Sequence, residues 1–142
     1  MNAIELTKLL RKLGACDAAR EWAKGKDLHE VWTTCEQGDW LLWLAGRMAD
    51  KPGWPTRKQI VLAACSCAET TLKFVKVGEE RPRMAIETAR AWVRGEVSID
   101  DVKRAADGAY ADARAKAQTE YVEIVRRELG EPLQGAIREV AL

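Results

Sequence analysis

The apolar positions of this 142-residue chain recur every three or four residues, which is the spacing of helices. No stretch alternates convincingly between apolar and polar residues, so the pattern predicts no strand. The first helix is predicted over residues 3–13 and is ended by Gly14. Its leucines share one face: Leu6, Leu9, Leu10 and Leu13.

Two short helices are predicted to follow. Asp17 is the expected N-cap of a helix that carries Trp22. Asp27 and Glu30 have the spacing of a capping box, in which each side chain accepts a hydrogen bond from the other residue's backbone N–H. That helix is expected to end at Gly38, a residue that takes a left-handed backbone without a Cβ penalty.

The segment 38–48 is expected to be the centre of the fold. Asp39 is placed to cap a new helix, and residues 40–45 leave no polar face on its first turn and a half. A helix that is apolar all round belongs inside a protein, and this one is far too short to cross a bilayer. The pattern therefore predicts a buried helix with Trp40 and Trp43 in the core.

The middle of the chain predicts a second central helix. Thr56 and Gln59 form another capping-box pattern, and residues 60–68 are apolar nearly all round. This helix is expected to stop near Gly78 and to bury one continuous stripe: Val61, Cys65, Ala68, Leu72 and Val75.

The last third predicts three more helices. Pro82 favours a first helical turn, and Gly95 closes that helix, whose expected inner face is Ala85, Ile86, Ala89, Trp92 and Val93. Ser98 is expected to cap the longest helix, over residues 99–129. Its expected inner face is Ile99, Val102, Ala106, Ala109, Ala113, Ala117, Tyr121 and Ile124. Gly130 then ends it, and Pro132 opens a last short helix.

These elements predict an all-α fold, a compact single domain over residues 1–142 with about seven or eight helices around tryptophan-rich buried helices. Six tryptophans against one phenylalanine indicate well-anchored helix crossings.

The charge balance narrows the classes of partner. A formal net charge of +1 provides no strong field for nucleic acid or an anionic membrane, and it disfavours mimicry of nucleic acid. No signal peptide is visible, and four cysteines without one indicate reduced thiols. We therefore expect a cytoplasmic protein that does not interact with membranes.

The residues favour no catalytic centre. His29, the only histidine, is expected to face solvent, and Ser66 and Ser98 lack a neighbouring base. The cysteines (Cys16, Cys35, Cys65 and Cys67) lack the paired spacing of structural zinc, so buried free thiols are expected. No cofactor motif is present. We predict a protein that is not an enzyme and has no cofactor or metal.

One candidate contact surface lies in the proline-bracketed loop. Trp54 could anchor a partner there, with Arg57 and Lys58 beside it, because a tryptophan on a stiff loop loses little entropy on docking. The alternative is that Trp54 folds back over the core as a lid.

A second candidate surface is a basic helix face. Arg83, Arg90 and Arg94 recur at helical spacing with Arg81 beside them, and they could contact an acidic partner. The alternative is a solvated face with pairs such as Arg83–Glu87.

Several motifs resemble a known family. The segments R-P-R-M-A-I-E at 81–87, A-R-A-W at 89–92 and R-G-E at 94–96, with the alanine-rich stretch through Arg114, are similar to the Imm5-like group of immunity proteins. The segment G-D-W-L-L-W-L-A at 38–45 resembles small phage and prophage proteins. The resemblance implies a helical fold and a link to bacterial polymorphic toxin systems, and it supplies no catalytic residue.

The sequence therefore predicts a non-enzymatic binding protein that blocks a protein partner sterically. The partner would be a toxin or a host defence component, the latter as for an anti-CRISPR protein. The alternative is a nucleic-acid-binding helical regulator. The oligomeric state stays open.

Overall fold

Eight α-helices and one 3₁₀ helix make up the part of the chain that the computed structural model describes, residues 1–106 and 118–132. The α-helices are α1 (Ala3–Leu13), α2 (Asp17–Ala23), α3 (Leu28–Thr34), α4 (Gly38–Arg47), α5 (Arg57–Thr71), α6 (Arg81–Val93), α7 (Ile99–Ala106) and α9 (Gln118–Leu129). The 3₁₀ helix η1 spans Leu72–Phe74. These residues contain no strand, so the predicted all-α fold is confirmed.

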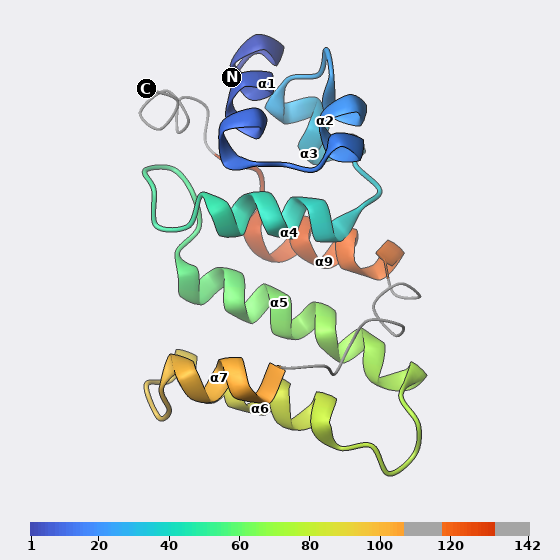
Figure 1. The fold of residues 1–142 in the computed structure, drawn as a ribbon, viewed down its shortest axis with the longest axis vertical. Coiled ribbons are helices and arrows are strands. Elements are labelled where there is room, and N and C mark those ends of the chain that lie inside the picture. The colour runs from blue at the N-terminus through green and yellow to red at the C-terminus, as the bar shows by residue number, and fades with distance from the viewer. Residues whose placement is uncertain (107–117, 133–142) are drawn as a thin grey trace.

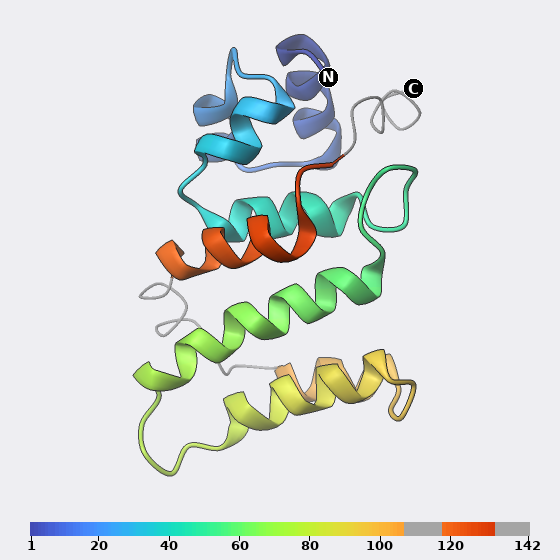
Figure 2. The ribbon, with the colours of Figure 1, turned by 180° about the vertical axis from the view of Figure 1, so that it is seen from behind.

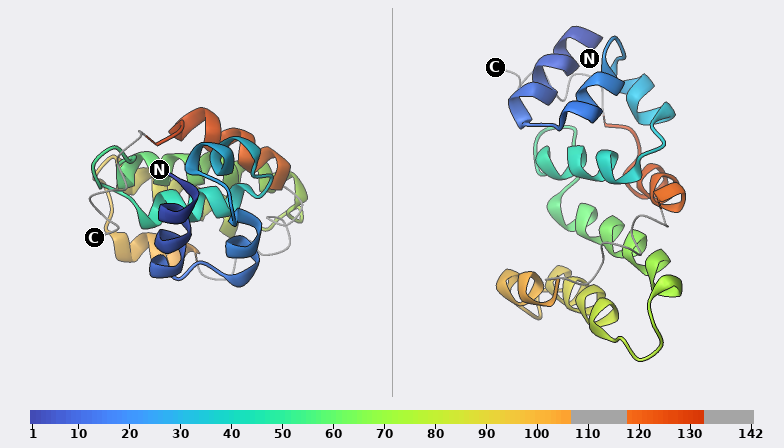
Figure 3. Two further views of the ribbon diagram at one scale, coloured as in Figure 1. Left: turned by 90° about the horizontal axis from the view of Figure 1, so that it is seen from above. Right: turned by 45° about the vertical axis from the view of Figure 1, so that its right-hand side comes forward.

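The helices are arranged in successive layers along the long axis (Figure 1). The short helices α1, α2 and α3 form one end, and α4 and α9 lie side by side below them (Figure 2). The next layer is α5, which packs against α4, α6 and α9. The far end is the α6–α7 pair (Figure 3). The central position predicted for the helix after Thr56 is therefore confirmed.

The hydrophobic core lies where α1 and α3 meet the α4–α9 layer. Its largest fully buried apolar side chains include Leu6 and Leu9 of α1, Leu41 of α4 and Val125 of α9. Met48, just after α4, is also fully buried. The contact between α5 and α6 lies outside this core and buries Cys65, Ala85 and Ile86.

Most of the predicted helix ends are confirmed. Asp27 and Glu30 form a capping box, with the Glu30 N–H donating to the Asp27 carboxylate at 2.8 Å. Thr56 and Gln59 form another. The Asp101 N–H donates to the Ser98 hydroxyl at 3.2 Å, as expected for a cap of α7. Glycines with a left-handed backbone follow four of the helices, namely Gly14 after α1, Gly25 after α2, Gly95 after α6 and Gly130 after α9. Pro82 lies in the first turn of α6.

The prediction that Asp17 caps α2 is wrong. Cys16 occupies the N-cap position and makes no side-chain capping bond, whereas Asp17 is the first helical residue. The Asp17 carboxylate instead forms an ion pair with Arg20, one turn along the same helix. An acidic side chain in the first turn is still favourable, because it faces the positive end of the helix dipole.

The role predicted for Gly38 is also wrong. The backbone of α3 ends at Thr34, and Gly38 is the first residue of α4 instead of a left-handed cap. Glycine is required there for a different reason. A Cβ at this position would lie 2.3 Å from the Val122 backbone nitrogen of α9, closer than any real Cβ contact.

The helix α5 buries two faces, and the sequence predicted only one stripe. The Cys65 thiol donates to the Ile86 carbonyl of α6 at 3.8 Å, and the Cys67 thiol donates to the Tyr121 carbonyl of α9 at 3.8 Å. The two thiols therefore face opposite neighbours, as residues two apart on a helix must. The predicted residues Ala68, Leu72 and Val75 are only half-buried.

The single helix predicted over residues 99–129 is wrong. The structure has α7 packed against α6 and a separate helix, α9, packed against α4 and α5, in a different layer (Figure 1). Tyr121 and Ile124 are buried as predicted, but Ile99 is exposed. The predicted positions Ala109, Ala113 and Ala117, and the helix after Pro132, lie outside the described residues.

Candidate binding site

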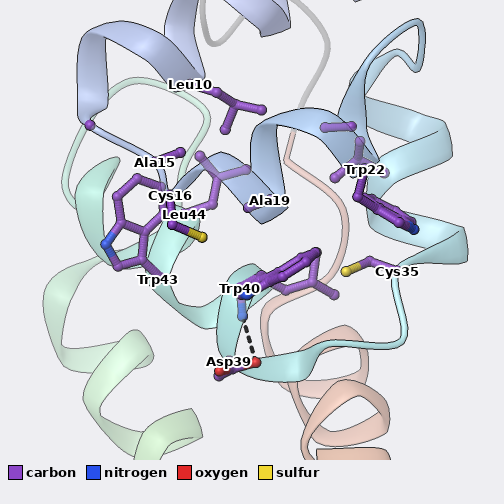
Figure 4. A pocket seen from close by; sticks show the side chains of 14 residues that line it. Leu10, Ala15, Cys16, Ala19, Trp22, Cys35, Asp39, Trp40, Trp43 and Leu44 are labelled. Carbon is purple, nitrogen blue, oxygen red and sulfur yellow. Dashed lines mark hydrogen bonds between the residues drawn. The ribbon is translucent and has the colours of Figure 1, made fainter.

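A pocket of about 380 Å³ lies among the first four helices. Its walls come from α1, the turn after it, α2, α3 and α4, and three of its lining residues are tryptophans: Trp22, Trp40 and Trp43 (Figure 4). Leu10 and Leu44 add aliphatic surface. The pocket is therefore mainly apolar, with aromatic walls.

Trp22 and Trp40 pack against each other along one side of the pocket. Their ring centroids are 6.2 Å apart and the planes cross at 61°, an edge-to-face arrangement that aromatic pairs favour. The Lys26 ammonium lies 4.5 Å from the centroid of the Trp22 ring and donates to the Trp22 carbonyl oxygen at 2.5 Å. These contacts hold the Trp22 side of the pocket in place.

The prediction that α4 is buried all round, with both tryptophans in the core, is wrong. Leu41, Leu44 and Ala45 are buried, but Trp40 is only half-buried and Trp43 is 38% exposed. The helix packs against α9 and α5, and these neighbours cover one side of it. Trp40 and Trp43 lie on the other side of α4, where the pocket separates this helix from parts of α1, α2 and α3.

The pocket also contains a carboxylate. Asp39 is half-buried in the first turn of α4, and its Oδ1 accepts a hydrogen bond from the Trp40 N–H at 3.1 Å. The prediction that Asp39 caps α4 is nevertheless wrong, because Gln37 occupies the N-cap position and no side chain makes a capping bond there.

Two thiols line the same pocket. Cys16 is exposed, which corrects the expectation that all four cysteines are buried. Cys35 is buried and donates to the Gln37 carbonyl at 3.5 Å, and burial raises the pKa of its thiol. Cys16 is therefore the more accessible of the two.

Trp54 is buried, so the lid interpretation holds and the exposed-anchor interpretation does not. Only 7% of the residue is exposed, and it belongs to the main hydrophobic core. The loop closes on itself because the Asp50 N–H donates to the Pro55 carbonyl at 3.0 Å and the Trp54 N–H donates to the Lys51 carbonyl at 2.9 Å. This closure turns the indole inward.

The two basic residues beside this loop are exposed. The Arg57 backbone N–H donates to the Asp50 carboxylate at 3.0 Å, and the Arg57 guanidinium lies 4.0 Å from the same group. Lys58 follows on the surface of α5. A partner could therefore contact Arg57 and Lys58, but not the buried indole of Trp54.

Four arginines each pair with a carboxylate, and they are called the α6 arginines here: Arg81, Arg83 and Arg90 of α6, and Arg94 at its C-cap. Their partners are Glu79, Glu80, Glu69 and Glu96 respectively. Arg83 thus pairs with Glu80 at 3.5 Å, and not with the expected Glu87. The hydrogen bonds from Arg81 lower the pKa of Glu79 to about 2. The carboxylates offset much of the positive charge of this face.

The groups considered for catalysis have structural contacts. His29 is exposed as predicted, and its Nδ1 lies 2.9 Å from the Glu131 carboxylate. Ser66 donates to the Leu62 carbonyl of its own helix at 3.2 Å. Within residues 1–106 and 118–132, no three histidine, cysteine or carboxylate side chains form a group that could hold a metal ion.

Sequence reasoning missed the pocket, although it singled out several of its residues. Trp40 and Trp43 are three apart, so they share a face of α4, whereas Leu41 and Ala45 lie on its buried face. The signal in the sequence was that α4 is short and yet has a second apolar face, which its core contacts do not need. Only the positions of α1, α2 and α3 decide that this face is open.

The family comparison is informative for the second half of the chain. The model of the Imm-5 like putative immunity protein family matches residues 55–130, which is more than half of the chain. The chain belongs to this family. The predicted family resemblance is therefore confirmed. No curated protein and no solved structure shows significant similarity to the chain.

The matched segment includes α5, α6, α7 and α9, whereas every pocket residue lies between Leu10 and Leu44. This Imm-5 like protein therefore carries its tryptophan pocket on helices outside the family match. Membership of an immunity-like family is consistent with a protein-binding role. Among the described residues, no helix has the length and apolar character needed to cross a membrane.

Proposed function

We propose that this protein neutralises a toxin by binding it and covering its functional surface, without catalysing a reaction. The family supports a protein partner, because its members are described as immunity proteins. The groups considered for catalysis, His29 and Ser66, make contacts within the protein itself. Steric blocking needs only a stable complex, so a rigid helical scaffold is sufficient for it.

The observation that carries the proposal is the tryptophan pocket. Trp43 is 38% exposed, and it lines the pocket together with the half-buried Trp22 and Trp40. Tryptophan is enriched among the residues that contribute most to the affinity of protein complexes, and such residues occur in pockets from which the partner removes water. A pocket of about 380 Å³ is large enough for a side chain of a partner.

We propose a second contact surface besides the pocket, formed by the α6 arginines together with Arg57 and Lys58. Each α6 arginine is exposed or half-buried, so a partner could reach it. Charges at the rim of an interface mainly increase the association rate and the specificity. We therefore assign this surface to orientation of the partner and the pocket to affinity.

Two alternatives differ in the partner. A host defence component would be bound by the same surfaces, as for an anti-CRISPR protein. Nucleic acid is disfavoured because phosphates would compete with the carboxylates already paired with the α6 arginines, and the net charge is only +1.

The test is an affinity capture from the native host, followed by mass spectrometry and an activity assay of the captured protein. We expect one stoichiometric protein whose toxic activity is abolished by an equimolar amount of this chain. Recovery of a defence component would identify the first alternative. Recovery of nucleic acid alone, or a captured protein that stays fully active, would contradict the proposal.

A matched pair of variants assigns the contact to the pocket. Trp43→Ala should reduce recovery of the partner at least about tenfold, as for a residue central to an interface. Leu62→Ala is the control, because Leu62 is similarly exposed at 41% but lies on α5 outside the pocket. Equal recovery with both variants would place the contact elsewhere.

A further inference from the structure

A groove of about 500 Å³ lies between α1 and α2 and shares no lining residue with the tryptophan pocket. Its lining consists of Thr7 and Arg11 of α1, Asp17, Arg20 and Glu21 of α2, and Lys24 just after α2. Three of these residues are cationic and two are carboxylates, so the lining has a formal charge of +1. We infer that the groove binds a carboxylate side chain, aspartate or glutamate, of the protein partner. This inference rests on the proposed function.

The charges that α2 contributes to the groove are balanced among themselves. The Arg20 guanidinium pairs with the Asp17 carboxylate. The Lys24 ammonium lies 3.9 Å from the Glu21 carboxylate. The excess positive charge of the groove therefore comes from α1, where Arg11 is the only charged residue among the described residues of the lining.

Arg11 has donors available for a new partner. Within residues 1–106 and 118–132, its exposed side chain forms no ion pair or hydrogen bond. Its guanidinium carries five N–H donors in a planar fork, which matches the two oxygens of a carboxylate. Hydrogen bonds between these two charged groups are stronger than those between neutral groups. A carboxylate that enters the groove gains such bonds without breaking an existing pair of Arg11.

Arg20 contributes a second donor. Its Nε is buried and has no hydrogen-bond partner among the described residues, whereas its Nη2 donates to Asp17. A donor enclosed in this way has lost its bonds to water without replacement, which costs free energy. Rotation of the half-buried Arg20 side chain would present Nε to a carboxylate in the groove, so binding can also satisfy this donor.

The same lining disfavours a run of phosphates, as in nucleic acid. Asp17 and Glu21 are exposed carboxylates in the groove, and several phosphates would bring repeated negative charge close to them. A single carboxylate instead balances the formal charge of the lining. The groove therefore favours one acidic side chain of a protein over a polyanion.

The groove and the tryptophan pocket are built on the same two helices. On α1, Leu10 lines the pocket and Arg11 lines the groove. On α2, Ala19 lines the pocket and Arg20 lines the groove. A partner bound over this end of the molecule therefore has both sites within reach.

The test uses small probes and needs no partner protein. The Nε–H signals of the arginines are followed by NMR at pH 6 during titration with N-acetyl-glutamate α-amide, whose side chain is ionised because its usual pKa is about 4.3. N-acetyl-glutamine α-amide is the uncharged probe of nearly the same shape, and inorganic phosphate is the competing anion. We expect the Arg11 and Arg20 signals to shift and saturate with the glutamate probe. This probe should bind at least about fivefold more tightly than the glutamine probe.

Arg47 is the control. Like Arg11, it is an exposed arginine in the last turn of a helix, without an ion pair or hydrogen bond of its side chain in the described part of the chain, but it lies outside the groove. Its signal should not shift. Arg11→Gln should abolish the preference for the glutamate probe, whereas Arg47→Gln should leave it unchanged.

Three results with the wild-type protein would overturn the inference, and none of them depends on a variant folding. They are equal affinity for the glutamate and glutamine probes, equal shifts of the Arg11 and Arg47 signals, and tighter binding of phosphate than of the glutamate probe. Because no partner is present, such a result leaves the proposed function to the capture experiment.

Discussion

Gly38 of α4 and Tyr121 of α9 lie so close together that no other residue fits at position 38. An added Cβ would be 2.5 Å from the Tyr121 carbonyl carbon and 2.6 Å from the Tyr121 Cβ. Both contacts are far shorter than van der Waals distances, and one of them is to backbone. The missing side chain of Gly38 therefore sets how closely α4 and α9 pack.

Gly38→Ala should lower the free energy of unfolding by about 3 kcal/mol, because overpacking forces the two helices apart. The measurement is urea unfolding followed by circular dichroism. The control is Gly46→Ala in the same helix, where an added Cβ meets nothing within 4 Å. This change should stabilise the protein by up to about 1 kcal/mol, since alanine has the higher helix propensity. Similar losses for both variants would show that the α4–α9 contact is not the reason.

Trp54→Ala should destabilise the protein by about 3–5 kcal/mol, as for truncation of a large core residue. Trp54→Phe should cost less, because the buried Nε1 of Trp54 has no hydrogen-bond partner among the described residues and its loss leaves no partner unsatisfied. Thermal and urea unfolding of both variants provide the comparison. Nearly native stability of Trp54→Ala would return the residue to the exposed-anchor interpretation.

Arg126→Met should cost about 1.5–3 kcal/mol, because the Arg126 guanidinium of α9 closes the end of α3. Its Nε donates to the Trp32 carbonyl at 2.7 Å, and its Nη2 donates to the Cys35 carbonyl at 2.7 Å. Arg127→Met is the control, since the Arg127 side chain is 69% exposed and should change stability by less than about 0.5 kcal/mol. If both variants lost the same free energy of unfolding in urea, the hydrogen bonds from Arg126 to the end of α3 would not contribute to stability.

The contact between His29 and Glu131 should make stability depend on pH. The hydrogen bond and the charge of Glu131 raise the pKa of His29 above its usual value of about 6.5. A raised folded-state pKa contributes stability that is fully present below the unfolded-state value and is lost as the pH rises through the folded-state value. The difference in urea midpoint between the wild-type protein and His29→Gln should therefore shrink from pH 5 to pH 8. A constant difference would contradict the linkage.

Only one of the four thiols should react rapidly in the native protein. Cys16 is exposed, whereas Cys35, Cys65 and Cys67 are buried. Burial raises the pKa of Cys67 to about 12, and the thiolate is the reactive form. Brief treatment with iodoacetamide should add one label by mass spectrometry, and Cys16→Ser should add none. Rapid labelling of several cysteines in the native state would contradict the burial of Cys35, Cys65 and Cys67.

Local signals predicted most of the helices well. Asp27 and Thr56 each begin a helix through contacts with a residue three positions later, and Gly14 ends a helix by its own backbone preference. Such interactions are complete within one turn, so they need no knowledge of the rest of the fold. Pro82 likewise marks the first turn of α6 by its own backbone preference. The segment around it lies within the part of the chain that the family model matches.

The burial of individual tryptophans could not be predicted from the local sequence. The sequence predicts Trp43 in the core, but this residue is 38% exposed. It offers Trp54 as a partner contact, but only 7% of that residue is exposed. Both residues are large, apolar and in apolar or stiff surroundings, so their own neighbours in sequence do not distinguish them. Which indole is covered depends on where α1, α2, α3 and α9 lie.

Most of the helices, several of their caps and the family could be predicted from the residues alone, because these depend on patterns within a few residues or on similarity along the chain. Tertiary structure decided that Gly38 receives α9, that α7 and α9 are separate helices in different layers, and that a tryptophan pocket containing Asp39 stays open. The reason is that helix periodicity states which residues share a face, whereas burial of that face depends on the neighbours that long-range packing brings to it.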